Sequence, residues 1–257
     1  MHIVMRKNDA GMLAVLHGYA RCVLQGAGLF FGCRCALCGA VIRTREELFP
    51  GVCHACCLEL VLRTGGYCPG CGRLYASVGE DIYLCSHCRH APEPWSGVGF
   101  YAPYSGLLKS LITGYKFRSK LGTGRLLGRL LVRAFKAHGL NRPDLVVPVP
   151  LHPRRLYARG YNQSLELARY IVPETGGVLE YGALRRVRNT KAQSGLERKA
   201  RLANIEDAFA VRPESVRKKK ILIVDDVLTT GATLRTCART LLRAGAARVE
   251  VLVLARA

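Results

Sequence analysis

The residues best suited to chemistry lie near the C-terminus, in the run Ile-Leu-Ile-Val-Asp-Asp-Val-Leu-Thr-Thr-Gly-Ala-Thr-Leu at positions 221–234. The run opens with four aliphatic residues, which is typical of a parallel strand covered by helices on both faces. Beyond Gly231, apolar residues recur at helical spacing, at Leu234, Ala238, Leu241 and Leu242. We therefore expect a strand, a short polar loop, and a helix that begins at the Thr-Thr-Gly and ends near Gly245.

This strand, loop and helix together predict a site for a sugar phosphate. The first turn of the helix offers free backbone N–H groups, and Thr229, Thr230 and Thr233 add hydroxyl donors, a combination that suits a phosphate. Asp225 and Asp226 lie just upstream, at the strand end where open α/β sheets bind ligands. A ligand that places hydroxyl groups between its phosphate and the two acids relieves the repulsion, because each hydroxyl donated to a carboxylate contributes roughly 1.5–3 kcal/mol. A ribose 5-phosphate has this arrangement.

An ordinary strand and an N-capped helix are the alternative, since successive strand residues point to opposite faces and the two acids need not meet one ligand. The run as a whole resembles the ribose-phosphate signature of type I phosphoribosyltransferases. The match is at Asp225, Asp226, Thr229, Thr230, Gly231, Ala232 and Thr233. The resemblance implies binding of phosphoribosyl pyrophosphate with Mg²⁺.

Four Cys-x-x-Cys pairs in the first third of the chain predict metal binding. They are Cys35 with Cys38, Cys53 with Cys56, Cys68 with Cys71, and Cys85 with Cys88. Within each half, 14 or 13 residues separate the pairs, a spacing that suits the loop of a zinc ribbon. We expect two ribbons, each with one structural Zn²⁺ held by four cysteines, because a zinc site supplies on the order of 10 kcal/mol to a stretch poor in apolar residues. Disulfides and redox-active thiols are the alternatives.

Charge is concentrated in the half that carries the Asp-Asp run. Residues 1–100 hold 9 Lys+Arg against 7 Asp+Glu, a net charge of +2, which leaves 30 against 11, or +19, for residues 101–257. A field of this sign attracts a phosphorylated substrate and nucleic acid about equally. The longest uncharged stretch, residues 94–108, is too short to span a bilayer, and no apolar core of a signal peptide follows Arg6 and Lys7. We expect a cytoplasmic protein with no membrane span.

The second half also carries the other elements of a parallel sheet. The glycines at 97–99 indicate a linker, helical spacing appears at 107–112 and 123–137, and apolar runs at 145–149 and 249–254 predict strands. We expect the last of these strands at the sheet edge. Tyr115-Lys116-Phe117-Arg118 places aromatics beside cations, which suits a stacked base or, more often, a helix end with one aromatic buried.

A basic loop is expected to follow the strand at 145–149. By βαβ logic this strand lies beside the Asp-Asp strand, so that His152, Arg154, Arg155 and Arg159 face the same edge of the sheet. The Cys-x-x-Cys ribbons, Pro-Val-Pro-Leu-His at 148–152, Arg-Gly-Tyr-Asn-Gln at 159–163 and the Asp-Asp signature together resemble the ComF family over nearly the whole chain.

The ComF resemblance implies a zinc-binding N-terminal region on a phosphoribosyltransferase-like domain, with a bacterial role in natural competence and uptake of single-stranded DNA, and competence proteins as partners. It also implies that residues 151–162 form a pyrophosphate-binding loop. From this loop we assign substrate binding to His152, Arg154, Arg159, Asn162 and Gln163.

Residues 184–201 carry 7 cations and one acid between two expected strands, and they resemble the mobile loop that closes over the substrate. Closure would bring Arg188, Lys191 or Gln193 to the departing pyrophosphate, where positive charge stabilises the transition state. We assign Arg188 and Lys191 as catalytic. A disordered basic loop is the alternative.

The expected architecture is α/β: a type I phosphoribosyltransferase-like parallel sheet with helices on both faces, preceded by a small double zinc ribbon. We place an N-terminal helix at 1–31, the double ribbon at 32–93 and the phosphoribosyltransferase-like domain at 94–257. Two functions fit: a Mg²⁺-dependent phosphoribosyltransferase with an unknown acceptor, or a catalytically silent protein that holds single-stranded DNA through phosphates and stacked bases.

Overall fold

The structure is a computed structural model that describes residues 34–42, 49–76, 79, 81–117, 121–187 and 208–257. The chain divides into two compact units, Met1–Glu59 and Leu60–Ala257. In its described part, the first unit contains an antiparallel bridge between Arg34 and Val41 and the helix α2 (His54–Glu59). The second unit holds the last two Cys-x-x-Cys pairs, which we call the second pair of cysteine knuckles (Cys68 with Cys71, and Cys85 with Cys88). It also holds the helix α3 (Ser86–His90) and the whole main sheet.

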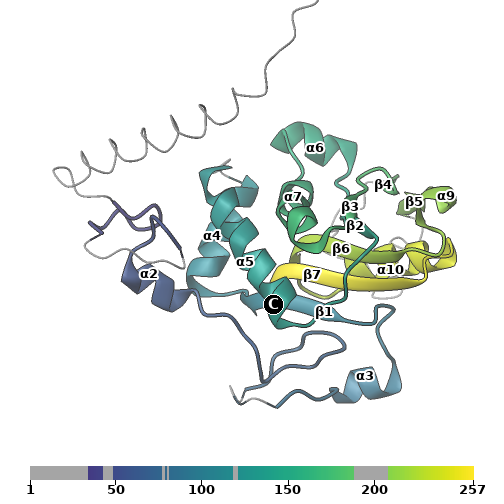
Figure 1. The fold of residues 1–257 in the computed structure, drawn as a ribbon, viewed down its shortest axis with the longest axis horizontal. Coiled ribbons are helices and arrows are strands. Elements are labelled where there is room, and N and C mark those ends of the chain that lie inside the picture. Colours follow the sequence, from purple (N-terminus) through teal and green to yellow (C-terminus); the bar gives the residue numbers. More distant parts are fainter. Residues whose placement is uncertain (1–33, 43–48, 77–78, 80, 118–120, 188–207) are drawn as a thin grey trace, which may run out of the picture. The chain divides into compact units, whose positions relative to one another are not determined.

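The main sheet has five parallel strands in the order β1, β7, β6, β2, β3 (Figure 1). They are β1 (Val98–Pro103), β2 (Leu145–Pro148), β3 (Val178–Leu179), β6 (Lys220–Leu228) and β7 (Arg248–Arg256). Ile221 lies beside Leu145 on one side and Val249 on the other. The aliphatic run therefore occupies the middle of the sheet, as its lack of polar alternation predicts.

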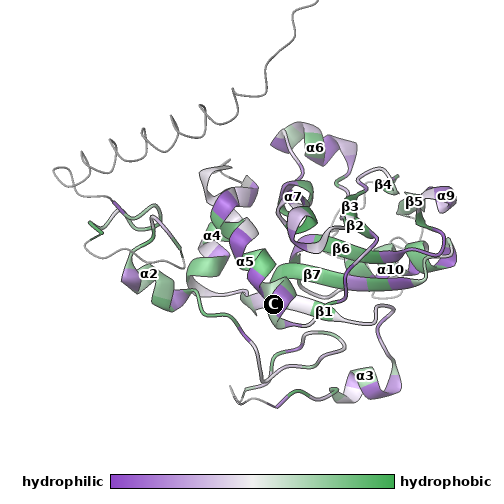
Figure 2. Ribbon diagram, in the orientation of Figure 1, coloured by the Kyte–Doolittle hydropathy of each residue, from purple (hydrophilic) through white to green (hydrophobic). Residues whose placement is uncertain are grey.

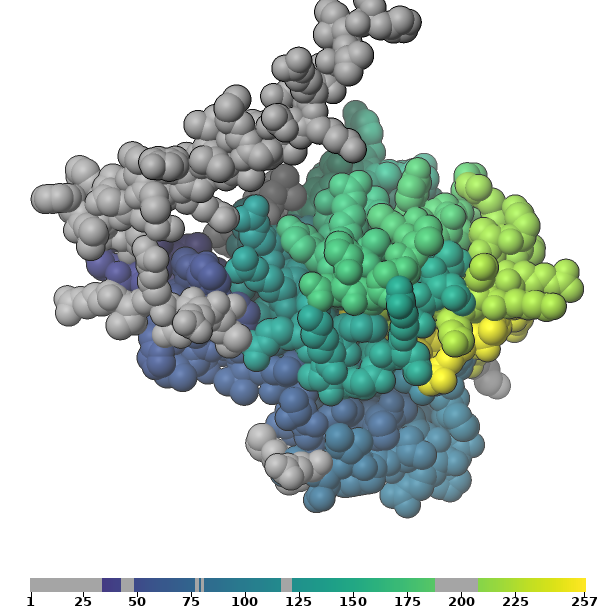
Figure 3. All heavy atoms as spheres, viewed as in Figure 1, coloured from purple at the N-terminus to yellow at the C-terminus, as the bar shows by residue number. Residues whose placement is uncertain are grey.

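Helices cover both faces of this sheet. The helices α5 (Gly124–Ala137) and α7 (Gln163–Thr175) contact each other and pack on the strands, and α4 (Gly106–Phe117) packs on α5. The opposite face contacts α10 (Ala232–Arg243), whose Leu234, Ala238 and Leu241 share a core with Ile221, Ile223 and Val251. Figure 2 shows β6 and β7 as largely hydrophobic ribbons, and in Figure 3 the spheres of the teal and green helices hide most of the C-terminal strand.

Shorter elements complete the second unit. They are the 3-10 turn η1 (Leu121–Thr123), α6 (Pro153–Arg159), α9 (Pro213–Val216) and the antiparallel pair β4 (Leu184–Arg186) and β5 (Phe209–Val211). In the ranges that the structure describes, no helix is long and apolar enough to cross a membrane. The predicted helices after Gly231 and over 123–137 are confirmed, with the expected apolar residues buried except Leu242, which is half-buried.

Two expectations about the sheet are wrong. The glycines at 97–99 do not form a linker, because Val98–Pro103 is a strand that pairs with β7. The last strand is consequently flanked by β1 and β6 and is no edge. Gly99 is needed for packing: a Cβ there would lie 2.9 Å from Leu140 Cδ1 and 3.1 Å from Leu252 Cδ1. A glycine that permits close approach resembles a linker glycine in sequence.

Candidate functional site

Asp225 and Asp226 lie in the C-terminal half of the strand β6, and their side chains have different partners. The Lys116 ammonium, at the end of α4, is 2.9 Å from both carboxylate oxygens of Asp226, whose side chain is only 8% exposed. Asp225 Oδ1 accepts hydrogen bonds from Ser164 Oγ at 2.8 Å and from the Asp226 backbone N–H at 2.9 Å. The two acids thus belong to one site, and elements from three parts of the chain satisfy them.

The environment of Asp225 favours its neutral form. Burial raises the pKa of Asp225 to about 7, and the negative charge of Asp226 acts in the same direction. The hydrogen bonds from Ser164 and the Asp226 N–H, and the charge of Lys116, oppose this increase. At neutral pH the Asp225 carboxyl is therefore about half protonated.

The loop after β2 folds around the short helix α6, and several of its predicted site residues have structural contacts. His152 Nδ1 accepts the Arg154 N–H at 3.3 Å and caps α6, while Asn162 Oδ1 accepts the Ser164 N–H at 3.1 Å and caps α7. Gln163 is buried and donates to Lys116 O at 3.5 Å. These residues shape the loop and hold α4 against α7. Arg154 is exposed on α6.

Arg159 and Arg186 are close enough to the acids for their charges to interact, and Arg155 is close enough to act on both arginines. Burial lowers the pKa of Arg159. The charge of Asp226 opposes this decrease, and the charge of Arg155 adds to it. Burial likewise lowers the pKa of Arg186, with a further decrease from Arg155 and an increase from Asp225. We name Arg155, Arg159 and Arg186 the arginine cluster. Positive charges that repel one another beside buried acids create a place where an anion is stabilised.

The loop between β6 and α10 has the geometry of a phosphate cradle. Gly231 adopts φ 79°, a left-handed conformation that favours glycine. Thr229 and Thr230 are exposed, and Thr233 is half-buried in the first turn of α10. The N-cap residue Gly231 has no side chain, and Thr230 Oγ1 accepts a long hydrogen bond of 3.5 Å from the Ala232 N–H. The first-turn N–H groups and the macrodipole of α10 favour an anion at this end of the helix. We name residues 229–233 the phosphate loop.

Two arginines brace the backbone of the phosphate loop and tie it to the second pair of cysteine knuckles. Arg256 donates to Thr229 O at 2.7 Å and Leu228 O at 3.1 Å through Nη1, and to Cys71 O at 3.1 Å through Nε. Arg235 donates to Thr230 O at 2.7 Å and binds both oxygens of the buried Glu93 at 2.6 Å. The loop carbonyls are thereby held from the ribbon side of the sheet.

The eight paired cysteines form two groups of four, with the sulfurs of each group within 4.8 Å of one another. They are Cys35, Cys38, Cys53 and Cys56, and Cys68, Cys71, Cys85 and Cys88. In each group a close sulfur pair lies 3.6 or 3.8 Å apart, near the distance of about 3.8 Å that tetrahedral zinc with bonds of about 2.3 Å requires and far from a disulfide of about 2.05 Å. None of these eight cysteines forms a disulfide. Both groups are compatible with structural zinc.

The backbone of each group also favours a thiolate. Burial opposes ionisation of Cys35, but N–H groups of Cys38, Cys53 and Leu37 outweigh it and lower the Cys35 pKa to about 6. In the second group, burial again opposes ionisation, and backbone N–H donors lower the Cys68 pKa to about 7. Thiolates are the form that binds zinc.

The expected catalytic residues and the expected stacking aromatic are two further parts of the predicted site. Arg188, Lys191 and Gln193 fall outside the described residues, and the segment assigned to the mobile loop begins in β4 at Leu184–Arg186. Tyr115 is 3% exposed and accepts the Tyr161 hydroxyl at its backbone oxygen. It is therefore the buried aromatic of a helix end, and stacking of a base on this ring is excluded.

Comparison with known proteins finds relatives that cover most of the chain. A family model described as a phosphoribosyl transferase domain matches residues 162–257. A DNA utilization protein from Salmonella typhi is 33% identical over 80% of this chain and 97% of its own length. Competence protein F from Haemophilus influenzae is 32% identical over 89% of this chain and 99% of its own length. Competence protein ComFC from Bacillus subtilis is 30% identical over 76% of this chain and 80% of its own length.

Loss of the second cysteine group is expected to unfold more of the molecule than loss of the first. Trp95 Nε1 donates to Gly70 O at 2.7 Å and Arg256 to Cys71 O, so the second group is built into the unit with the sheet. We expect about two zinc ions for each purified chain and about one in Cys35→Ser and in Cys68→Ser. Cys68→Ser alone should lower the main melting temperature, by about 2–4 °C for each kcal/mol lost. Equal melting temperatures, or a wild type without zinc, would contradict this.

The raised pKa of Asp225 predicts a pH-dependent stability. Below about pH 4 the carboxyl is neutral in both states, and between that pH and about 7 the folded chain retains a proton that the unfolded chain releases. The free energy of unfolding should therefore fall as pH rises through this window. The Asp225→Asn variant lacks this titration, so its free energy of unfolding should not show the same decrease. The melting temperature of the variant minus that of the wild type should therefore increase from pH 5 to pH 8. Exposed Asp81→Asn is the control, and parallel curves for all three proteins would refute the assignment.

Proposed function

The chain belongs to the ComF family, and on that premise we propose that it binds phosphoribosyl pyrophosphate at the carboxyl edge of β6. The observation that carries the proposal is the direct succession of the half-buried Asp225, the buried Asp226 and a helix start with glycine at its N-cap along one strand, loop and helix. The phosphate loop takes the 5-phosphate through its N–H groups and the hydroxyls of Thr229, Thr230 and Thr233. Asp225 and Asp226 accept the ribose hydroxyls.

The rest of the site suits the pyrophosphate. The arginine cluster comes from α6, which follows β2, and from β4. The charges of Arg159 and Arg186 interact with those of the acids, and guanidinium groups in this place would stabilise a leaving group that gains charge. Arg188 and Lys191 are proposed to approach the same group. Asp225 and Asp226 supply the carboxylate oxygens that Mg²⁺ prefers, and together with the oxygens of the ligand they would hold the ion, which neutralises pyrophosphate charge.

Lys116 has a role that the sequence does not predict. Its ammonium contacts both oxygens of Asp226 at 2.9 Å, which are the atoms that the ribose hydroxyls need. Binding of the sugar therefore requires this ammonium to move from at least one oxygen. Asp225 must accept a hydrogen bond as well, and it does so best when ionised, above its pKa of about 7.

Titration calorimetry with phosphoribosyl pyrophosphate and Mg²⁺ at pH 8 tests the proposed site. Asp226→Asn leaves the shape and removes the charge that accepts the ribose hydroxyls, so the affinity should fall about 10-fold or more. Asp144→Asn is the matched control, because Asp144 accepts from Lys220 N at the opposite, amino end of β6. Equal affinities in wild type and Asp226→Asn, or loss of binding in Asp144→Asn, would remove the basis of the proposal.

A second function, the handling of single-stranded DNA in competence, is favoured by the exposure of α6. None of its residues is buried, and Tyr157 and Leu156 are 93% and 43% exposed. Arg154 and Arg155 lie exposed beside them. An exposed aromatic among cations is the composition of a platform on which bases stack while the backbone is neutralised. The relatives named for competence and DNA utilization fit such a role.

Fluorescence anisotropy with a labelled oligothymidylate tests the platform. Tyr157→Ala should weaken binding about 5- to 100-fold without changing the salt dependence, since stacking contributes roughly 1–3 kcal/mol for each base. Arg154→Gln should reduce the slope of log affinity against log salt by about 0.7. Tyr181→Ala, at a residue 70% exposed, is the control. If Tyr157→Ala binds DNA as the wild type does, α6 is not the platform.

A further inference from the structure

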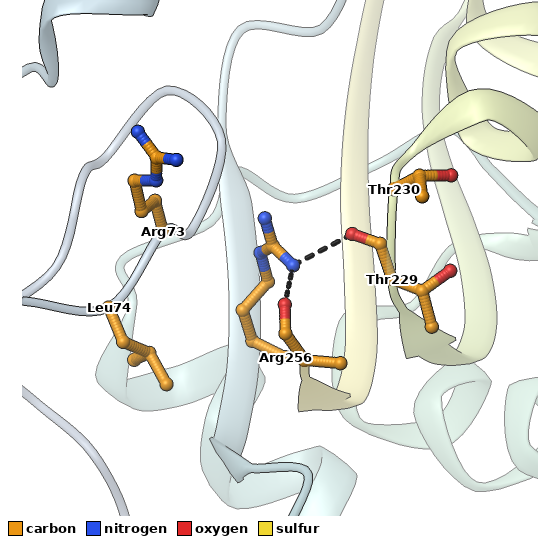
Figure 4. Close-up of a pocket in the computed structure, with 6 residues that line it drawn as sticks. Arg73, Leu74, Thr229, Thr230 and Arg256 are labelled. Atoms are coloured by element: carbon orange, nitrogen blue, oxygen red, sulfur yellow. Dashed lines mark hydrogen bonds between the residues drawn. The ribbon is translucent and has the colours of Figure 1, made fainter. Parts of the chain in front are cut away.

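A cavity of about 520 Å³ lies between the second cysteine ribbon and the end of the sheet, within the unit Leu60–Ala257. Its lining consists of Arg73, Leu74, Thr229, Thr230, Arg256 and Ala257. Figure 4 shows the Arg256 guanidinium between Arg73 on one side and Thr229 on the other. The cavity therefore shares the backbone of the phosphate loop as one wall and has the ribbon as the opposite wall.

The strand order places this cavity opposite the pyrophosphate loop. Leu228 of β6 lies beside Arg256 of β7, and Val224 of β6 lies beside Pro148 of β2. The basic loop with α6 follows β2, whereas the cavity opens at the end of β7. The acids at the end of β6 thus have the arginine cluster on one flank and the cavity on the other.

Building on the phosphoribosyl site proposed above, we propose that this cavity binds the acceptor of phosphoribosyl transfer, and that the acceptor is an anion. In the transfer, a nitrogen or oxygen of the acceptor forms a bond to C1 of the ribose. The bond between C1 and the pyrophosphate oxygen breaks, and its electron pair leaves with pyrophosphate. An acceptor that attacks C1 in line with this bond must stand on the flank away from the leaving group.

The charge of the lining defines the class of acceptor. Arg256 uses Nε and Nη1 for its contacts with backbone oxygens, and none of the described residues accepts from Nη2. The Arg73 guanidinium is exposed and forms no hydrogen bond or ion pair with a described residue. Glu93, in the adjoining cavity, is already held by Arg235. Burial lowers the pKa of Arg256, and the charge of Glu93 opposes this decrease, so Glu93 partly offsets the charge of Arg256. Arg73 has no carboxylate side chain bonded to it among the described residues, so its guanidinium is the main positive charge that faces the cavity.

The lining also lacks a general base. None of the six side chains is a carboxylate or an imidazole, so no side chain there takes a proton from the attacking atom. An acceptor whose attacking ring nitrogen carries no proton needs no such group, and a carboxylate elsewhere on its ring would bind the guanidinium groups. Leu74 offers an apolar edge to a ring. A heteroaromatic carboxylate combines these properties.

Matched ligands separate charge from shape. We propose calorimetric titration of the full chain with orotate and nicotinate as carboxylate probes and with uracil and nicotinamide as their neutral counterparts, with and without phosphoribosyl pyrophosphate and Mg²⁺. At least one carboxylate probe should bind about 10-fold tighter than its neutral counterpart. Arg73→Gln should abolish that preference and leave phosphoribosyl pyrophosphate affinity unchanged. Arg125→Gln, at an exposed residue of α5, should retain both.

Three results would overturn the inference. These are equal binding of charged and neutral probes, an unchanged preference in Arg73→Gln, and displacement of phosphoribosyl pyrophosphate by the carboxylate probe, which would place the probe on the phosphate loop. The sugar titration alone separates the two proposals. If phosphoribosyl pyrophosphate binds and no carboxylate does, the cavity assignment fails by itself. If a carboxylate binds through Arg73 and the sugar does not, the proposed function fails and the cavity remains an anion site.

Discussion

Two neighbouring carboxylates at the end of a buried strand are the constraint around which this molecule is arranged. Burial and mutual repulsion both disfavour a doubly charged pair, and the raised pKa of Asp225 reflects this. An ammonium from α4 and a hydroxyl from α7 contact the two acids, and the charges of arginines from α6 and β4 interact with them. Such an arrangement costs stability that a simple core would not, and perturbed carboxyl groups of this kind are typical of functional sites, which supports the proposed sugar-phosphate site.

The second cysteine ribbon is part of the same arrangement. Arg256 and Arg235 connect the carbonyls of the phosphate loop to Cys71 O and to Glu93, which follows the last cysteine knuckle. The ribbon is further fixed by Tyr67, whose hydroxyl lies 2.9 Å from His138 Nδ1. A metal that orders the ribbon therefore also restricts the loop on which a phosphate would rest, and it forms one wall of the cavity at the end of β7. The ribbon is in this sense a component of the site.

Local pattern predicts most of the fold and part of the site. The strand over 221–224, the helices α5 and α10 and the grouping of cysteines follow from periodicity and spacing, which are properties of contiguous residues. The sequence does not predict strand β1, because a glycine that is required for close packing cannot be distinguished by sequence from a glycine in a linker. The pairing of Lys116 with Asp226 joins residues 110 positions apart, and nothing in either neighbourhood indicates it. Arg186, Arg235 and Arg256 reach the site by strand pairing and helix packing, which a single sequence does not encode locally.

A crystal of the chain soaked with ribose 5-phosphate tests the central claim most directly. The account predicts the phosphate on the N–H groups and hydroxyls of residues 229–233, the ribose hydroxyls within hydrogen-bond distance of Asp225 and Asp226, and the Lys116 ammonium moved from at least one Asp226 oxygen. A sugar phosphate bound elsewhere, with Lys116 still on both oxygens of Asp226, would contradict it.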